Sequence, residues 1–198
     1  MAMNTKTPRH VMIDLETMGR TPEQPIVSIG AVIFDPRYGV ITDETFYWEL
    51  HWKSQGRNAD PDTVTWWASQ SAEARAVLDG IDDLQDALEA LSEWLPKDCR
   101  VWGNGSIFDI ATLEHAYRQY KIEIPWKFWN VYDCRTVLAL YEAKRGGLDR
   151  SKSNHGTAHN ALDDAIFQAK WVTVCWSDLQ SNEAAPEKRS TGRLRPVR

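Results

Sequence analysis

The sequence lacks the features that would mark a membrane protein or a disulfide-stabilised secreted protein. No apolar run approaches the roughly 20 residues that a membrane-spanning helix needs. Residues 1–10 are polar and contain no apolar stretch like that of a signal peptide. The three cysteines are odd in number and widely spaced, without a metal-ligand pattern, which predicts buried thiols in a reducing compartment. We therefore expect a cytoplasmic protein with no membrane partner.

The sequence also lacks the surplus of positive charge that is typical of proteins that coat nucleic acid. Its 198 residues carry a formal net charge of −5, with 42% hydrophobic and 26% charged residues, as in ordinary globular proteins. Residues 181–198 hold a net +3, so the remaining body is at −8. An acidic body suits a protein that gathers carboxylates around divalent cations, which then meet a phosphate. We predict one domain over residues 1–180 and a basic, disordered tail over 181–198.

Hydrophobic patterning predicts an α/β protein with one central mixed sheet flanked by helices. Strand-like runs come first, and helices then alternate with short strands. In such sheets, ligand sites collect where strands end. The predicted strands are 10–13, 26–34, 45–50, 100–102 and 130–133, with a hairpin turn at 35–39 and a mobile loop at 146–156. The predicted helices are a short one capped by Asp62 or Thr63, then 81–95, one that follows 103–105, one that ends near 141, and 160–179.

Two carboxylates, Asp14 and Glu16, stand at the end of the first predicted strand. Residues two apart on an extended chain share a face, so both side chains can point at one ion. The apolar residues 11–13 before them predict a buried strand, where carboxylates are costly unless they are ligated or exposed. A solvated surface pair without a function is the alternative for this motif on its own.

Further acidic groups stand near the starts of two predicted helices. Asp109 fits a catalytic carboxylate, but also a side chain that is favoured there by the helix dipole. Asn160 and Asp163 fit a helix cap and its third-position partner. This pattern leaves His159 just before the last helix and Asp164 in its first turn, where both can face one cavity.

Carboxylates that converge on one place repel each other unless they are protonated or neutralised by a metal. Oxygen ligands without cysteine favour Mg²⁺ or Mn²⁺. Two such ions about 4 Å apart can activate a water and stabilise the leaving oxygen in phosphodiester hydrolysis. The reaction also needs a base, and histidine, with an unperturbed pKa of about 6.5, suits that task near neutral pH.

Taken together, three motifs resemble those of the DnaQ-like DEDDh exonuclease family. They are Asp14-x-Glu16, Asn104-x-x-x-Phe108-Asp109 and His159-x-Ala161-x-x-Asp164, in that order, and the resemblance spans residues 10–175. The resemblance implies an RNase H-like fold and two-metal removal of nucleotides from 3′ ends. It implies that Asp14, Glu16, Asp109 and Asp164 hold the metals, that His159 is the general base, and that Thr17, Met18, Asn104 and Phe108 contact the substrate.

Two other segments narrow the resemblance to one group within that family. Residues 62–75 (DTVTWWASQSAEAR) and 127–136 (KFWNVYDCRT) resemble phage exonuclease A (DexA) and related proteins. This group includes exodeoxyribonuclease VIII-like proteins and exoribonucleases, so it supports the reaction better than a sugar preference. Trp66 and Trp67 either offer a stacking surface to unpaired bases or fix the short helix onto the core. Both interpretations stay open at this point.

We therefore expect a 3′→5′ exodeoxyribonuclease that acts on single-stranded or frayed DNA and releases nucleoside 5′-monophosphates. The nearest alternative is an exoribonuclease with the same site. A non-catalytic nucleic-acid-binding module would not need a histidine beside four carboxylates. A hydrolase of small phosphate esters leaves the tryptophan-rich segment unexplained. A homodimer is open, because some of the ten tryptophans could line an interface.

Overall fold

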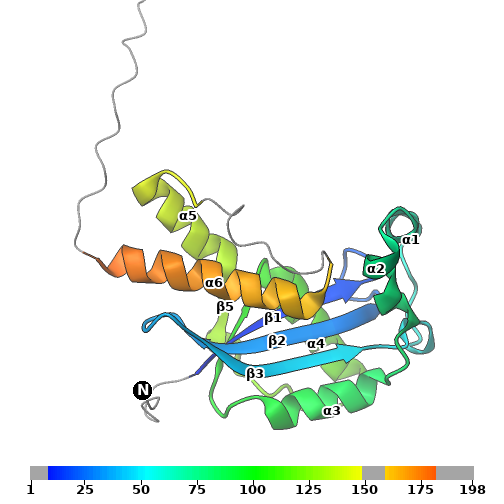
Figure 1. Cartoon of the computed structure of the whole chain (residues 1–198). Helices are drawn as coiled ribbons and strands as arrows, with labels where there is room; N and C mark the ends of the chain where they lie inside the picture. The colour runs from blue at the N-terminus through cyan, green and yellow to red at the C-terminus, as the bar shows by residue number, and fades with distance from the viewer. Residues whose placement is uncertain (1–8, 149–158, 182–198) are drawn as a thin grey trace, which may run out of the picture.

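A five-stranded mixed sheet organises the computed structural model, which describes residues 9–148 and 159–181 (Figure 1). The strand order is β3-β2-β1-β4-β5; β1 pairs with β2 and β2 with β3 antiparallel, whereas β1 pairs with β4 and β4 with β5 parallel. This confirms the predicted α/β architecture with a mixed sheet. The strands are β1 (His10–Thr17), β2 (Ile26–Asp35), β3 (Val40–Glu49), β4 (Arg100–Gly103) and β5 (Val131–Asp133).

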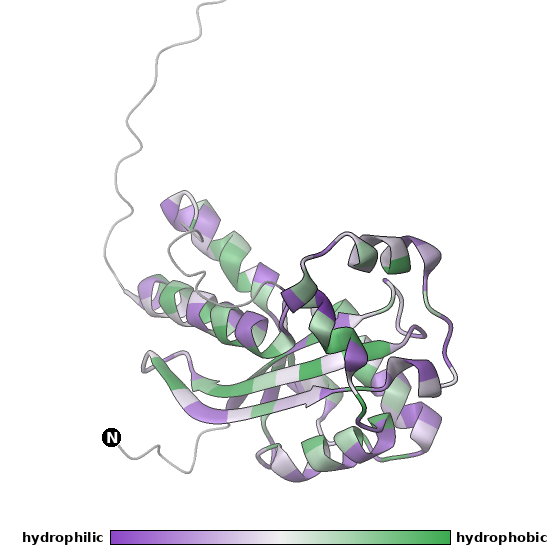
Figure 2. Cartoon of the chain, turned by 45° about the vertical axis from the view of Figure 1, so that its right-hand side comes forward, coloured by the Kyte–Doolittle hydropathy of each residue, from purple (hydrophilic) through white to green (hydrophobic). Residues whose placement is uncertain are grey.

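Helices cover both faces of this sheet, as Figure 1 shows, with α5 and α6 on one side and α3 and α4 on the other. Hydrophobic residues predominate along β2, whereas β3 mixes hydrophobic and hydrophilic residues, and the helices carry bands of both kinds (Figure 2). The helices are α1 (Pro61–Ala68), α2 (Ala72–Arg75), α3 (Leu84–Trp94), α4 (Ser106–Tyr120), α5 (Cys134–Arg145) and α6 (Ala161–Gln180), with 3-10 turns at Trp52–Ser54, Ala76–Asp79 and Phe128–Asn130.

Side chains alternate along β1, so successive residues point to opposite faces of the sheet. Val11, Ile13 and Leu15 pack into the core beneath α3 and α4, and Met12 packs into the core beneath α5 and α6. Because side chains alternate along a strand, Asp14 and Glu16 share the Met12 side, under α6. The same strand thus builds one core and presents two carboxylates beside the other.

Two helix starts differ from the sequence prediction. The cap of α1 is Asp60, whose side chain accepts a hydrogen bond from the Asp62 amide, and not Asp62 or Thr63. Helix α3 begins at Leu84 and not at Ile81, because Asp83 caps it. Residues 80–82 are held beside the end of β3, where the Asp82 amide donates to the Glu49 carbonyl. Ile81 is therefore exposed rather than part of the helical face.

Several strands and one helix are also longer than the sequence predicted. Strand β1 continues past residue 13 to Thr17, so the acidic pair lies within the strand, and β3 begins at Val40 rather than at residue 45. Helix α5 continues to Arg145. Strand pairing explains the first two differences, since β1 pairs with β2 as far as Thr17 and Ile26, and β3 pairs with β2 from Val40 and Asp35 onward.

The other predictions about the chain's organisation have mixed outcomes. The capped helix after residue 160 is confirmed, and all three cysteines are buried thiols. Within the described ranges, no helix is long and apolar enough to span a membrane. Most of the predicted loop at 146–156 and nearly all of the predicted tail at 181–198 lie outside the described residues.

One buried histidine at the start of β1 makes the stability of the fold depend on pH. His10 lies among the rings of Phe34, Trp102 and Trp176, and its Nδ1 accepts a hydrogen bond from the indole N–H of Trp102 at 2.9 Å. Burial, together with the charge of the neighbouring Arg100, lowers the pKa of His10 from 6.5 to about 4. The neutral ring is therefore the form that the fold needs.

We predict that acid weakens the folded state through His10. The unfolded chain takes up this proton below pH 6.5, but the folded chain does so only near pH 4, so the free energy of unfolding falls across that window. The shift corresponds to a loss of about 3 kcal/mol as an upper bound. Urea unfolding at pH 7.5, 6, 5 and 4.5 measures it. The His10→Asn variant, which keeps an acceptor for Trp102, should show a smaller loss, and equal losses in the two proteins would contradict the assignment.

Candidate active site

A cluster of three carboxylates stands where β1 meets the first turn of α6. Asp14 and Glu16 come from β1 and Asp164 from α6, and one carboxylate oxygen from each lies within 4.8 Å of the others. All three side chains are half-buried. The structure therefore brings together residues 150 positions apart in the sequence, as the motif pattern predicts.

The close packing of α6 on β2 makes this cluster possible. Gly30 lies opposite Asp14 on β2, and a Cβ at Gly30 would overlap the backbone of Ala161 and Leu162. Only a residue without a side chain lets the first turn of α6 approach the sheet so closely. Asn160 fixes the same turn, because its Oδ1 accepts from the Leu162 amide and its Nδ2 donates to the Tyr47 hydroxyl on β3.

Asp109 reaches the cluster from α4, on the opposite face of the sheet. Its side chain is only 4% exposed. The Leu15 amide on β1 donates a hydrogen bond to the Asp109 carboxylate. This bond and the charge of Arg135 on α5 both lower the pKa of Asp109, against the effect of burial. Asp109 is not one of the three residues within the 4.8 Å group, but its charge raises the pKa of both Asp14 and Glu16.

Burial and mutual repulsion hold the acidic groups toward their neutral forms. The pKa of Glu16 is raised to about 8 and that of Asp109 to about 7, and those of Asp14 and Asp164 are also raised; burial is the largest cause in each of the four. The charges of Asp164 and Asp109 contribute to the raised pKa of Glu16. Four oxygen-bearing groups with suppressed ionisation fit a site that a divalent cation neutralises. The residues present therefore suit Mg²⁺ or Mn²⁺.

His159 lies just before α6, in contact with the aromatic side chains of α1. Its ring meets that of Trp66 edge to face at 4.8 Å, and its backbone is left-handed, with φ of 63°. The charge of His159 lowers the pKa of Asp164 in the first turn of α6. His159 thus contacts Trp66 of α1 at the start of the helix that carries Asp164, and its role as a base stays a prediction.

A cavity of about 500 Å³ opens beside the carboxylates, a size typical of small-ligand pockets. Of the predicted substrate contacts, Thr17, Phe108 and Trp66 line it. Trp66 is 41% exposed, whereas Trp67 is buried, with its indole N–H donating to the Thr17 carbonyl at 3.0 Å. The full lining is Leu15, Glu16, Thr17, Gly19, Arg20, Asp62, Thr63, Trp66 and Phe108.

The structure thus separates the two tryptophans, of which Trp66 faces the cavity and Trp67 the core. Met18 is also a core residue, 1% exposed and packed in one cluster with Trp67. Asn104 is half-buried in the turn after β4 and is not part of the cavity wall. Met18, Trp67 and Asn104 thus do not line the cavity, and contact with a substrate stays a prediction for all six residues.

Sequence reasoning missed one residue at this site, Gln168 of α6. Its Nε2 donates a hydrogen bond to Asp14 Oδ1 at 2.7 Å, which lowers the pKa of Asp14 against the effect of burial. Gln168 follows Asp164 by four residues, so both occupy one face of the helix. That four-residue spacing was the signal in the sequence that could have indicated a polar residue beside a carboxylate of the acidic cluster.

The fold is shared with several nucleases of known structure. The chain aligns with cell-death related nuclease 4 (TM-score 0.63, 14% identity, 84% of this chain and 62% of that one). It also aligns with E. coli exonuclease I in complex with a dA16 oligonucleotide (TM-score 0.64, 18% identity, 87% of this chain and 43% of that one). The nuclease domain of 3′hExo, a DEDDh family member bound to rAMP, aligns with a TM-score of 0.58 and 18% identity, over 88% of this chain and 94% of that one. The chain spans less than two thirds of the first two, and these likenesses define an RNase H-like fold of the DEDDh exonuclease kind.

The sequence comparisons identify the family. Residues 9–176 match the 3′-5′ exoribonuclease Rv2179c-like domain, and the chain belongs to this family of 3′-5′ exonucleases. An exodeoxyribonuclease of Enterobacteria phage T4 is 26% identical over 217 residues, covering 89% of this chain and 93% of the phage protein. These findings confirm the expected enzyme class.

We predict that adding one methyl group at position 30 removes activity before it removes the fold. In Gly30→Ala, the first turn of α6 must shift away from β2, which carries Asp164 away from Asp14. Overpacking of this kind costs about 1–3 kcal/mol, while a 1 Å displacement of a catalytic group can cost about 100-fold in rate. Nuclease assays well below the melting temperature measure the effect. Val172→Ala, in the buried core farther along α6, is the control for stability, and full activity in folded Gly30→Ala would contradict the role of the close approach.

A second prediction concerns Gln168. Gln168→Leu removes the hydrogen bond to Asp14, so the pKa of Asp14 rises and its carboxylate is less well oriented. Losing such a partner lowers metal affinity by about 10- to 100-fold. The Mg²⁺ concentration for half-maximal activity should rise about tenfold, with activity recovering at high Mg²⁺. An unchanged metal requirement would show that Gln168 serves only packing.

Proposed function

We propose that this exonuclease removes nucleotides one at a time from the 3′ ends of single-stranded or frayed DNA. The products are nucleoside 5′-monophosphates, and two Mg²⁺ or Mn²⁺ ions serve each active site. The observation that carries the proposal is the cluster of Asp14, Glu16 and Asp164 beside a cavity with an exposed tryptophan in its wall. Charged ligands for a cation and an aromatic surface for a base thus stand side by side.

The carboxylates of Asp14, Glu16, Asp109 and Asp164 would hold the ions. When bound, divalent ions supply an activated water and a charge that stabilises the leaving 3′-oxygen. The His159 imidazole, at the start of α6, would accept the proton of the attacking water as the general base. The edge-to-face contact between the rings of His159 and Trp66 supports this role, because it would hold the imidazole in one orientation.

The cavity wall would hold the terminal nucleotide. Trp66 and Phe108 both line the cavity and offer aromatic surfaces to a base, and stacking of this kind contributes ~1–3 kcal/mol per base. Base stacking is largely tolerant of sequence, because every base has a π face. A pocket that relies on it suits an enzyme that must accept each nucleotide of a strand in turn.

The preference for DNA is supported by the relatives, and so is a second candidate substrate. The phage T4 relative is named an exodeoxyribonuclease, and one structural neighbour is a complex with dA16. RNA is favoured by the name of the matched family and by the rAMP bound to the 3′hExo nuclease domain. A 3′-5′ exoribonuclease would use the same carboxylates and the same histidine.

A labelled-strand assay tests the proposal. We predict that 5′-labelled single-stranded DNA shortens from its 3′ end with Mg²⁺ or Mn²⁺ and stays intact with EDTA. Asp164→Asn should lower the rate at least 100-fold, because it removes a charge from the cluster. Asp86→Asn, an exposed carboxylate in the first turn of α3, is the matched control and should keep full activity.

RNA of the same sequence and a small phosphodiester complete the assay. Faster shortening of RNA than of DNA would replace the DNA proposal with the exoribonuclease. Hydrolysis of the small diester without shortening of either strand would contradict the proposed function. Full activity in Asp164→Asn would contradict the assigned site.

A further inference from the structure

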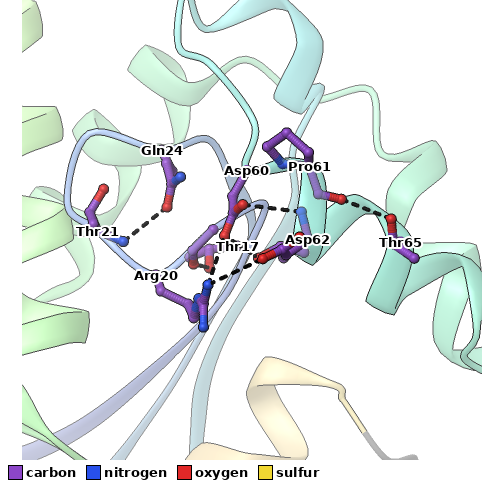
Figure 3. Close-up of polar contacts among 10 residues, drawn as sticks. Thr17, Arg20, Thr21, Gln24, Asp60, Pro61, Asp62 and Thr65 are labelled. Atoms are coloured by element: carbon purple, nitrogen blue, oxygen red, sulfur yellow. Dashed lines mark hydrogen bonds and ion pairs between the residues drawn. The ribbon is translucent and has the colours of Figure 1, made fainter.

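One cationic side chain stands in the wall of the cavity without a clear structural task. Arg20 follows β1 and is 77% exposed at its side chain. Its Nη2 lies 3.5 Å from Asp60 Oδ2 and 3.9 Å from Asp62 Oδ2, at the start of α1 (Figure 3). Among the cavity-lining residues that the structure describes, it is the sole arginine or lysine.

The fold does not depend on these ion pairs. Exposed ion pairs contribute about 0–1 kcal/mol, and the two distances are long for charge-assisted hydrogen bonds. Asp60 already has a structural role without Arg20, because it caps α1 and accepts from the Thr63 hydroxyl at 3.1 Å. Asp62 is 90% exposed at its side chain. The guanidinium can therefore leave both carboxylates at little cost.

The backbone that carries Arg20 is firmly held by other contacts. The Thr17 hydroxyl donates to the Gly19 carbonyl at 2.6 Å, and the Thr21 amide donates to Gln24 Oε1 at 2.9 Å. The Met18 amide donates to the Pro25 carbonyl at 2.8 Å. A rigid turn thus presents a long, exposed cation at a fixed place on the rim.

Charge balance indicates what this cation would meet. The charged residues of the cavity wall are Glu16 and Asp62, both acidic, and Arg20. A nucleic-acid strand whose terminal nucleotide fills the cavity brings further phosphates to the rim, close to those carboxylates. Arginine suits such a phosphate, because its planar guanidinium can donate two parallel hydrogen bonds.

We propose that Arg20 binds a backbone phosphate of the substrate strand and exchanges its ion pairs with Asp60 and Asp62 for that contact. Asp62 then acts as a competitor that holds the guanidinium until a strand arrives. This inference rests on the proposed function for a strand in the cavity, but it holds for DNA and RNA alike. Arg20 is thus a substrate-binding residue outside the acidic cluster and the histidine.

Steady-state kinetics with short labelled strands, DNA and RNA in parallel, test this inference. Arg20→Gln should raise KM about tenfold and leave kcat within about twofold. The slope of log KM against log salt should fall by about 0.7, as expected for one lost phosphate contact on a single strand. Arg20→Lys should keep the slope, because it keeps the charge. Arg118→Gln is the matched control, since Arg118 is similarly exposed and paired with one carboxylate on α4.

A double-variant cycle separates specific release of Arg20 from general charge effects. Asp62→Asn should lower KM about threefold when Arg20 is present, because the guanidinium loses its competitor. The same change in the Arg20→Gln background should have a clearly smaller effect. Equal effects in the two backgrounds would reduce Asp62 to a source of general repulsion and would overturn the exchange.

The rates of the wild type test the proposed function. The ratios of variant to wild-type kcat and KM test the role of Arg20. An active wild type with unchanged KM and salt slope in Arg20→Gln would overturn the Arg20 inference alone. A fall in kcat with unchanged KM would overturn it too, because it would indicate a structural effect. A wild type that shortens neither strand would overturn the proposed function and this inference with it.

Discussion

The approach of α6 to the sheet at Gly30 is the constraint on which the site depends. Two carboxylates lie on β1, and the third carboxylate of the close cluster lies on a helix that begins 147 residues after Asp14. The helix reaches them because β2 has no side chain where the backbone of Ala161 and Leu162 passes. Asn160 then fixes the turn through its cap and its bond to Tyr47. The sheet, the helix and the site are thus joined at one point.

The same packing creates an electrostatic strain that the chain alone does not relieve. Four acidic groups are brought out of water, and burial raises the pKa of each. The chain offsets part of this cost with Gln168 at Asp14 and with the Leu15 amide at Asp109. A bound cation would offset most of the remainder, so metal binding and the stability of this region are coupled. The polar site is accordingly set at the edge of two well-packed apolar cores.

The sequence motifs predicted the class of site well, because each motif residue acts through its chemical type. Acidic residues two apart on a strand, and a histidine before a capped helix, keep their meaning without coordinates. The mixed sheet and α6 were predicted for the same reason, since strand runs and the Asn160 cap are local signals. The family match over residues 9–176 agrees with this interpretation.

What the sequence did not reveal depends on contacts between distant segments. Helical spacing predicted a start at Ile81, but backbone pairing of Asp82 with the chain at the end of β3 delays the helix until Asp83 caps it. Pro61, a favoured first residue of a helix, was the missed signal for the Asp60 cap. Trp66 and Trp67 are adjacent on a helix and point about 100° apart, so only packing could show which one faces the cavity. Gly30 and Gln168 likewise have meaning only once α6 is placed on the sheet.

The most direct test of the account is anomalous diffraction from crystals of the protein soaked in Mn²⁺. The account predicts a manganese peak bound jointly by Asp14 and Glu16 of β1 and by Asp164 of α6. This result would show that packing at Gly30 assembles one cation site from two distant segments. A manganese ion held by the strand carboxylates alone, with Asp164 turned away, would contradict the central claim.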